Sequence, residues 1–458
     1  MLFRSVPGLT LSLTGLSLAV NTTGGPVAAI NGVAVNLPSG PYFRVAGHGS
    51  VGLANPSASL SGDFVFEPRD ADSNPGNGYE EVAVGVANVA FAFSEGAQTL
   101  VNVTQGSGVL VFRPSGLAGQ MSAQASIAVP GFSLSGIHTV ALNTSATAYN
   151  STVNVNGTSL ALNLGAGPYL KVSSTGSTAS PTATLQVQGT VLRGNFEFER
   201  KTTASSQTLV TIAMSAASVD LGPSGGSLVR VTGGSGLLLL SGAGIAGDAS
   251  ATVTLAVPGV TSSGTFRLRL NTRTSAVNET VTVGGSPVTV NVVAGPYVRV
   301  DATSASLAFL GINLSGNFSF EQRTSVAGQT LVTVEASNVA FGFGNGMVSA
   351  TNGTAFLAFS SGGVAGSGSV TVAVQAFGAG FSRTFDWSFN TLSSATTHQF
   401  NIGSTLRDLS LAGGPYFRLD SGPTPVGFDV SVGPLTVAMS GRVVLVIATS
   451  SRPLPEPR

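Results

Sequence analysis

The tripeptide Gly-Pro-Tyr occurs four times along the chain, each time followed by alternating apolar and polar residues. The four copies lie at Gly40–Tyr42, Gly167–Tyr169, Gly295–Tyr297 and Gly414–Tyr416. Successive copies are 127, 128 and 119 residues apart. A chain that resembles itself at a nearly fixed period is built from one structural unit used repeatedly. The sequence therefore predicts an array of β repeats of ~128 residues each.

Three further landmarks recur at nearly the same interval. The pair Asn-Thr begins at Asn21, Asn143, Asn271 and Asn390. The pattern Gly-polar-Phe-x-Phe-Glu spans Gly62–Glu67, Gly194–Glu199 and Gly316–Glu321, and the pattern Gly-x-Ala-Gly spans Gly116–Gly119, Gly244–Gly247 and Gly363–Gly366. In the fourth unit the Phe-x-Phe-Glu pattern degrades to Gly441–Leu445, and the Gly-x-Ala-Gly pattern is absent. We therefore divide the chain into repeat 1 (1–127), repeat 2 (128–255), repeat 3 (256–374), a partial repeat 4 (375–449) and a Pro-rich tail (450–458) predicted to be disordered.

The N-terminal segment keeps the phase of the repeats. Ser5–Gly8 matches Ala128–Gly131 and Ala256–Gly259, which all end in Val-Pro-Gly. A processed leader would not share the phase of the repeats, so we expect this segment to be ordinary repeat strand. The chain begins and ends out of phase with the repeat, and we interpret it as part of a longer array or as a truncated member.

Alternation of apolar and polar residues dominates between the landmarks. Phe266, Leu268 and Leu270 alternate with Arg267 and Arg269, for example. Side chains that alternate in this way lie on opposite faces of a strand. Short clusters of Gly, Ser, Asn and Pro separate the alternating runs and supply tight turns. Because 60 Gly and 22 Pro are spread through the chain, we expect an all-β fold with almost no α-helix.

The repeats abut without a Pro-rich or charge-rich linker, since the alternation continues through each junction. Domains strung like beads would be separated by flexible boundaries. We therefore predict tandem antiparallel β repeats that form an elongated meander, curled or folded into two layers, in which neighbouring repeats share a sheet or stack. The alternative architecture is a row of discrete β-sandwiches, one for each repeat.

Composition excludes several classes of function. Charged residues make up 9% of the chain, and 20 basic side chains balance 20 acidic ones. A nucleic-acid-binding protein would carry a basic face, so we expect no nucleic acid partner. No apolar run reaches the roughly 18 residues of a transmembrane helix. The chain has no cysteine, which excludes disulfides, thiolate nucleophiles and cysteine-bound metals.

One loop carries a pattern of calcium ligands. Asp70, Asp72 and Asn74 occupy positions 1, 3 and 5 of a twelve-residue loop, and Glu81 occupies position 12. Oxygen ligands at these positions converge on one hard cation. Position 6, normally glycine, is Pro75, and the flanking segments are predicted strands. The sequence leaves two readings open, a calcium site or a polar hairpin tip, and the corresponding loops of repeats 2 and 3 hold no acidic residue.

Two kinds of recurring side chain could carry chemistry. Tyr42, Tyr169, Tyr297 and Tyr416 could form a carbohydrate-stacking ladder. A residue used once per repeat is first a determinant of the fold, so we expect each ring to pack and each hydroxyl to bond to the backbone. We interpret Glu67, Glu199 and Glu321, each near an arginine, as strand-end charges facing water. A glycosidase needs two converging carboxylates, and none stands out, so we predict no enzymatic activity and no catalytic residue.

The abutting β repeats, the absence of cysteine, the two lysines (Lys171 and Lys201) and the strands rich in Thr, Ser, Gly and Val together resemble the repeat region of giant bacterial secreted or surface adhesin-like proteins. The resemblance covers nearly the whole sequence and rests on repeat style and composition. It implies an extracellular or cell-surface module with a structural or adhesive role, such as a stalk or a surface-layer-like element of a larger protein.

The partners expected from this resemblance are neighbouring repeats of the same or a longer chain, together with a surface glycan or a host or cell-surface receptor. No cofactor other than calcium is expected. Two alternative functions remain open from the sequence. One is an outer-membrane β-barrel, whose strands also alternate, and the other is a glycan-binding or glycan-cleaving β protein.

Overall fold

The computed structural model describes residues 8–71, 79–129, 132–135, 137–174, 183–187, 189–202, 208–223, 226–283, 286–343, 348–376, 379–402, 405–432 and 435–448. Strand accounts for 78% of the structure, and helix is absent from the described ranges. These ranges accordingly contain no helix that could span a membrane. The prediction of an all-β fold is confirmed. The predicted disordered tail, residues 450–458, lies outside the described residues.

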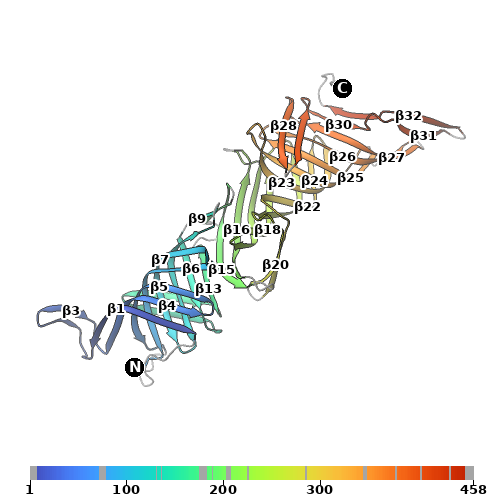
Figure 1. The fold of residues 1–458 in the computed structure, drawn as a ribbon. Coiled ribbons are helices and arrows are strands. Elements are labelled where there is room, and N and C mark those ends of the chain that lie inside the picture. The colour runs from blue at the N-terminus through green and yellow to red at the C-terminus, as the bar shows by residue number, and fades with distance from the viewer. Residues whose placement is uncertain are drawn as a thin grey trace. The chain divides into compact units, whose positions relative to one another are not determined.

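The strands follow one another along the whole chain (Figure 1). The first half contains β1 (Leu9–Asn21), β2 (Val27–Ile30), β3 (Val33–Leu37), β4 (Tyr42–Ala54), β5 (Ser57–Arg69), β6 (Glu81–Glu95), β7 (Gln98–Arg113), β8 (Gly116–Ile127), β9 (Phe132–Ser135), β10 (Ile137–Asn143), β11 (Tyr149–Val155), β12 (Thr158–Leu164), β13 (Tyr169–Ser174), β14 (Ala183–Val187), β15 (Thr190–Thr202) and β16 (Thr208–Leu221). The second half contains β17 (Val229–Ser241), β18 (Gly244–Leu255), β19 (Thr261–Asn271), β20 (Val277–Val283), β21 (Ser286–Val292), β22 (Tyr297–Phe309), β23 (Ile312–Thr324), β24 (Thr330–Phe343), β25 (Val348–Ser360), β26 (Gly363–Ala376), β27 (Ala379–Asn390), β28 (Thr396–Ile402), β29 (Thr405–Leu411), β30 (Tyr416–Asp420), β31 (Val426–Val432), β32 (Leu435–Gly441) and β33 (Val444–Ala448).

The chain forms two compact units. Unit 1 comprises Met1–Ala216, Leu237–Gly247 and Ala276–Asn291, and unit 2 comprises Ala217–Gly236, Asp248–Ser275 and Val292–Arg458. In unit 1 the hydrogen-bonded order is β1, β4, β5, β6, β7, β8, β10, β13, β15, with every neighbouring pair antiparallel. In unit 2 the order is β19, β22 to β27, β30, β33, again antiparallel throughout. The predicted antiparallel meander is therefore confirmed.

Neighbouring repeats share a sheet at the two junctions that lie inside these units. At the first, β8 of repeat 1 pairs with β10 of repeat 2, with Ala118 opposite Asn143. At the other, β26 at the end of repeat 3 pairs with β27 of repeat 4, with Ala365 opposite Asn390. The strand ladder thus continues across both junctions. At these junctions the alternative of discrete sandwiches is wrong.

A two-stranded hairpin leaves the meander between each Asn-Thr pair and the following Gly-Pro-Tyr. We call these hairpins arms: β2–β3, β11–β12, β20–β21 and β28–β29. Each arm is a separate two-stranded sheet, so its strands pair with each other and not with the long sheet. The sequence did not predict the arms, because their alternation has the same period as that of the sheet strands.

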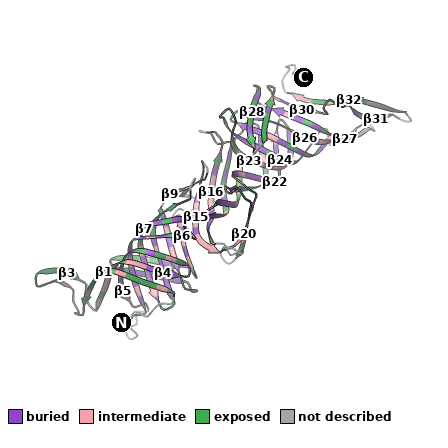
Figure 2. Cartoon of the chain, viewed as in Figure 1, coloured by how far each residue is buried: buried purple, intermediate pink, exposed green. Residues whose placement is uncertain are grey.

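The two faces of the sheet differ in character, as the alternating colours along the strands of Figure 2 show. One face carries the aromatic core. Phe309 stacks on Phe389 with ring centroids 4.0 Å apart, and the Trp387 and Phe389 rings are stacked at 5.8 Å. The opposite face carries the tyrosines of Gly-Pro-Tyr and the charged residues. Burial of these large aromatic rings, together with many aliphatic side chains, stabilises a chain that has no disulfides.

A line of β-bulges crosses the long strands. In unit 2 the pairing register shifts once or more in each of the pairs from β19–β22 to β25–β26, with Ser304, Asn338 and Asn352 at φ values of 49°, 53° and 55°. A bulge inserts one extra residue and increases the local twist and bend of the strand. Asparagine tolerates the left-handed conformation better than most residues, which explains its use in mid-strand.

Candidate functional site

The asparagine of each Asn-Thr pair closes the base of an arm. Its Nδ2 donates to a carbonyl four residues further on and to a second carbonyl at the far end of the arm, and its Oδ1 accepts the N–H two residues on. The bonds of Asn143 run to Thr147 O (2.8 Å), Gly165 O (2.8 Å) and Ser145 N (3.0 Å). Asn21, Asn271 and Asn390 make the same three kinds of bond, at 2.6 to 3.0 Å. All four asparagines are buried. A buried amide that satisfies three backbone groups fixes both ends of the arm.

The glycine of each Gly-Pro-Tyr completes this base. The Gly167 N–H donates to Ser145 O at 2.7 Å, and the other three glycines make the equivalent bond at 2.7 to 2.8 Å. No side chain fits at this position. A Cβ added to Gly167 would lie 2.0 Å from Asn143 O, and the corresponding distances at Gly40, Gly295 and Gly414 are 2.2, 1.9 and 1.9 Å. Glycine therefore recurs because another backbone passes in direct contact.

The threonine of Asn-Thr fastens the arm base to the preceding repeat. The Thr144 N–H donates to Leu117 O, and the Leu117 N–H donates to Thr144 Oγ1, both at 2.8 Å. Thr391 makes the same pair of bonds with Val364, at 2.9 and 2.8 Å. Leu117 and Val364 lie in the Gly-x-Ala-Gly pattern. Three sequence landmarks thus meet at one point, and we call this point the junction clasp.

The arm β11–β12 lies over β6, β7 and β8, which belong to the preceding repeat. Its apolar side chains and those of the strands beneath it form one core cluster. The members are Ala83, Val109, Val111, Ala118, Tyr149, Val153, Val155, Leu162 and Leu164. Complete burial of several aliphatic side chains stabilises such a contact by roughly 1.5–3 kcal/mol for each side chain. The arm therefore binds repeat 2 to repeat 1 through packing as well as through hydrogen bonds.

A polar cluster seals one end of this packed arm. The Tyr149 hydroxyl donates to Glu81 Oε2 at 2.8 Å, and Arg69 is paired with Glu81 and donates to Ser151 Oγ at 2.6 Å. The Arg113 guanidinium lies over the Tyr149 ring, 4.5 Å from its centroid. Burial and the bond to Glu81 raise the pKa of Tyr149 to about 12. The buried Glu81 is thus compensated by Arg69 and the Tyr149 hydroxyl, and Arg113 donates to Asn143 Oδ1 at 3.2 Å.

The arm β28–β29 repeats this arrangement in unit 2. Phe400 is fully buried in a cluster with Leu331, Ala358 and Leu409, and its ring meets that of Phe356 edge-on, 5.6 Å between centroids. Leu331 and Ala358 belong to β24 and β25 of the preceding repeat. The backbone also contributes, since the Val326 N–H donates to Gln399 O at 2.7 Å. Different side chains thus build the same contact at two junctions.

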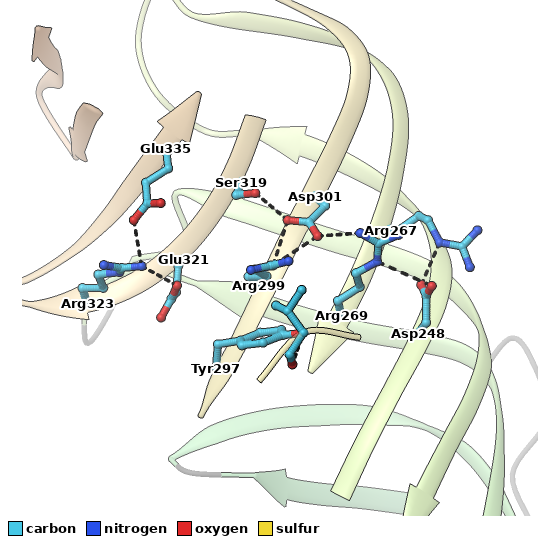
Figure 3. Close-up of polar contacts among 11 residues, drawn as sticks. Asp248, Arg267, Arg269, Tyr297, Arg299, Asp301, Ser319, Glu321, Arg323 and Glu335 are labelled. Atoms are coloured by element: carbon cyan, nitrogen blue, oxygen red, sulfur yellow. Dashed lines mark hydrogen bonds and ion pairs between the residues drawn. The ribbon is translucent and has the colours of Figure 1, made fainter. Parts of the chain in front are cut away.

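A chain of ion pairs crosses β18, β19 and β22 in unit 2 (Figure 3). Asp248 Oδ1 lies 2.7 Å from Arg267 Nε, and Asp248 Oδ2 lies 3.5 Å from Arg269 Nε. Arg269 Nη1 lies 2.9 Å from Asp301 Oδ2. Burial opposes the charge of Arg269, but Asp248 and Asp301 outweigh it, so the pKa of Arg269 is raised. Arg269 therefore links carboxylates of two strands.

Asp301 lies at the centre of this chain of ion pairs, which we call the ion-pair ladder (Figure 3). Arg299 Nε lies 3.0 Å from Asp301 Oδ1, and Ser319 Oγ donates to the same oxygen at 2.6 Å. The Arg299 guanidinium also covers the ring of Tyr297, 4.3 Å from its centroid. Because Arg269 holds the other oxygen, both carboxylate oxygens of Asp301 are used within the protein. This arrangement cross-links β19, β22 and β23 electrostatically.

The ladder continues at Arg323, which binds two carboxylates. Its Nη2 lies 2.7 Å from Glu321 Oε2 and 3.2 Å from Glu335 Oε1. Burial raises the pKa of Glu321, against the lowering effect of Arg323. Glu335 is half exposed. A shared guanidinium holds the two carboxylates in place, and its role is the cross-linking of β23 and β24.

Two of the four Gly-Pro-Tyr tyrosines are buried as expected, whereas Tyr42 and Tyr169 are half-buried. The Tyr297 and Tyr416 rings are buried, and Lys171 lies over the Tyr169 ring at 5.2 Å. The hydroxyls follow the expectation only in part. Tyr297 donates to Val293 O at 3.4 Å, whereas Tyr42 donates to the side chain of Glu67 at 3.2 Å. Basic side chains thus cover two of the ring faces that a stacked sugar would use.

The glutamates of Phe-x-Phe-Glu are less exposed than expected. Each is half buried. Glu67 Oε2 accepts the Asn156 N–H of an arm turn at 3.2 Å, and Glu199 pairs with Lys201 at 2.7 Å. The sequence suggested Glu67 and Arg69 as neighbours, but Arg69 lies opposite Glu81 in the β5–β6 ladder and pairs with it.

The predicted calcium ligands are only partly described. Asp72 and Asn74 lie outside the described residues, whereas Asp70 follows β5 and Glu81 begins β6. Glu81 is buried and its carboxylate binds Arg69 and Tyr149. Within the described ranges, no group of three or more acidic or histidine side chains is arranged to hold a metal ion. The calcium site stays a prediction.

The fold and the junction clasps define this chain as an all-β repeat protein in which shared sheets and packed arms join repeat 1 to repeat 2 and repeat 3 to repeat 4. No protein-family model, no curated protein and no solved structure matches the chain. Sequence reasoning identified the landmarks of the clasp but not their meeting point. The constant spacing of 24 residues between the asparagine and the glycine in the second, third and fourth arms is the signal that could have revealed it.

Proposed function

We propose that the chain is a non-enzymatic structural and adhesive repeat module, located outside the cell or on its surface. One observation carries the proposal: the asparagine and glycine that recur in all four copies, and the threonine at two junctions, bind backbone groups at the bases of the arms. The asparagine, threonine and glycine of each clasp hold backbone groups (as at Asn143, Thr144 and Gly167). Residues repeated for this purpose serve the continuity of the array.

The exposed side chains support an adhesive role in addition to the structural one. The sheet strands present Ser and Thr rows to solvent, such as Ser263 with Ser306, whose hydroxyls are 2.7 Å apart, and Ser235 with Ser250. A surface of this kind offers many weak hydrogen-bonding groups, which bind a partner when contacts are spread over several repeats. A surface glycan or a receptor on a cell surface is the partner class that fits.

The location is tested by labelling the source cells with an antibody raised against the purified chain. The proposal predicts equal labelling of intact and permeabilised cells, and loss of the signal after protease treatment of intact cells. Labelling that appears only after permeabilisation would refute the surface location. Beads coated with the full chain should then adhere to cells, whereas beads coated with a heat-denatured preparation should not.

The structural role is tested by removing one repeat in frame. Deleting residues 128–255 joins Ile127 to Ala256 and preserves the phase of the array, because Ala256–Gly259 matches Ala128–Gly131. This shortened chain should fold with an unchanged circular dichroism spectrum per residue. Deleting 128–245 breaks the phase and is the matched control, which should not fold. If both deletions behave alike, the clasps do not define the repeat.

A further inference from the structure

The first sheet strand has one free edge among the described residues. β1 pairs with β4 from Leu9 to Asn21. The strands that occupy the same place at later junctions, β10 and β27, pair on both sides: β10 with β8 and β13, and β27 with β26 and β30. β1 also carries no charged residue between Leu9 and Asn21. Natural proteins protect open strand edges with charges, proline, bulges or a cover. β1 has one bulge, between Thr14 and Ser17, but no charge or proline from Leu9 to Asn21, so the regular part of its edge, from Ser17 to Asn21, indicates a surface that another strand covers.

The side chains on β1 point to the same conclusion. Leu18 is 65% exposed and Val20 is 44% exposed. Counting back from the asparagine of each Asn-Thr pair identifies their counterparts in repeats 2 and 4, all at 1% exposure or less: Val140, Leu142, Trp387 and Phe389. The two positions that are buried at the junctions of repeats 1 and 2 and of repeats 3 and 4 are thus exposed on β1.

The arm β2–β3 and the threonine before it, Thr22, are also exposed to solvent. Ile30 and Val33, on the arm β2–β3, are 53% and 66% exposed, and the arm carries exposed segments in Figure 2. The later arms β11–β12 and β28–β29 cover strands of the preceding repeat. Thr22 is exposed, whereas its counterparts Thr144 and Thr391 bind the preceding Gly-x-Ala-Gly strand.

We propose that β1, Thr22 and the arm β2–β3 form a docking surface for a β-repeat unit whose outermost strand carries Gly-x-Ala-Gly. Two junctions in this chain define the register. The alanine of the incoming strand lies opposite Asn21, as Ala118 lies opposite Asn143. The next glycine lies opposite Val20, and the residue before the alanine binds Thr22. This inference deepens the proposed structural role by naming the partner, and it rests on that role.

A second copy of this chain is not the occupant. The outer strand of the long sheet at the other end of the described ranges is β33, which pairs with β30 and spans only Val444–Ala448. Its sequence, Val-Leu-Val-Ile-Ala, lacks the Gly-x-Ala-Gly pattern. It therefore lacks the glycines that fit beside the threonine of a clasp: a Cβ on Gly116 would lie 2.4 Å from Thr144 Oγ1.

The test uses a fluorescent peptide of Pro114–Ala128, which contains β8, and the purified full chain. Fluorescence anisotropy should show saturable binding, and hydrogen exchange of the β1 amides should slow when peptide is bound. The double variant Leu18→Lys/Val20→Lys should weaken binding at least tenfold. The matched control Val293→Lys replaces another exposed valine, at 55% exposure and far along the chain, and should leave binding unchanged.

A second peptide, with Leu117 and Gly119 replaced by proline, removes two N–H donors that face the partner strand and should not bind. The proposal is overturned if no saturable binding occurs up to about 1 mM peptide, or if the proline peptide or the lysine variant binds equally well. Concentration-dependent dimerisation that the lysine variant abolishes would assign the edge to a second copy instead. Surface labelling of cells is independent of these results, so failure of the proposed function is distinguishable from failure of this inference.

Discussion

Replacing Asn390 with alanine removes the bonds that close the base of the arm β28–β29. Asn390 is fully buried and donates to Ser394 O at 3.0 Å and Ala412 O at 2.8 Å, and it accepts the Leu392 N–H at 2.9 Å. Leaving a buried backbone group unsatisfied costs about 1–3 kcal/mol. Water entering the vacated space will form hydrogen bonds with some of these three backbone groups. We therefore expect the free energy of opening the arm to fall by about 3 kcal/mol.

This cost should appear as local opening of the arm, because a repeat array loses stability mainly where the change is made. Since about 1.4 kcal/mol corresponds to a factor of ten, the amides of Thr396–Leu411 should exchange with solvent roughly 100-fold faster in Asn390→Ala than in the wild type. Hydrogen exchange read by mass spectrometry measures this directly. The amides of β4 and β5 in unit 1 should keep their wild-type rates.

Asn401→Ala is the matched control, since Asn401 lies on β28 of the same arm and its side chain is exposed. Its effect should stay within about 0.5 kcal/mol, as for other surface substitutions. If Asn390→Ala leaves exchange in the arm within threefold of the wild type, the clasp asparagine does not hold the arm and the reasoning is refuted.

Three further predictions concern the clasp glycine, the ion pairs of Asp420 and the calcium loop. Gly167→Ala forces a Cβ to within 2.0 Å of Asn143 O, whereas a Cβ at Gly165 meets nothing within 4 Å. We expect Gly167→Ala to lower the free energy of unfolding by about 2–4 kcal/mol and Gly165→Ala to lower it by less than about 0.5 kcal/mol, as measured by denaturant unfolding. A comparable loss in both variants would contradict the steric argument. Hydrogen bonds from Arg442 and Arg418 hold the pKa of Asp420 well below its ordinary value of 3.8. The stability that this carboxylate contributes is therefore complete above pH 3.8 and is lost as the pH falls below that value. In Asp420→Asn the melting temperature should fall less steeply with decreasing pH below 3.8 than it does in the wild type. The same pH dependence in both proteins would argue against the ion pair. If Asp70, Asp72, Asn74 and Glu81 bind calcium, a chelator should lower the melting temperature of the wild type but not that of Asp70→Ala/Asp72→Ala, and identical curves with and without chelator would remove the site.

Much of the fold could be predicted from the sequence because strand alternation and turn residues are local signals. Phe266, Leu268 and Leu270 alternate with arginines, and the structure buries the three apolar side chains on β19. The arms were missed for a physical reason. A strand that leaves the sheet to form a hairpin alternates in the same way as a strand within it, so periodicity gives no information on which strands pair.

The clasp was recognisable only in fragments. Asn143 and Gly167 are separated by 24 residues, and Leu117 precedes Thr144 by 27, so the contacts depend on the path of the chain and not on neighbouring residues. The ion pairs show the same limit. Arg69 is two residues from Glu67 in sequence, but strand pairing places it opposite Glu81, and a cross-strand neighbour is closer than the residue two positions along the same strand.

The central claim is that neighbouring repeats share one sheet, and a disulfide across a junction tests it most directly. The chain has no cysteine, so two cysteines can be introduced without competitors. Gln120 lies opposite Ala141 in the β8–β10 pair, across the junction of repeats 1 and 2. Gln120→Cys/Ala141→Cys should oxidise to an intramolecular disulfide in the folded chain, whereas Gln124→Cys/Ala141→Cys, four residues out of register and about 13 Å away, should not. A disulfide in the second pair alone, or in neither pair, would contradict the shared sheet.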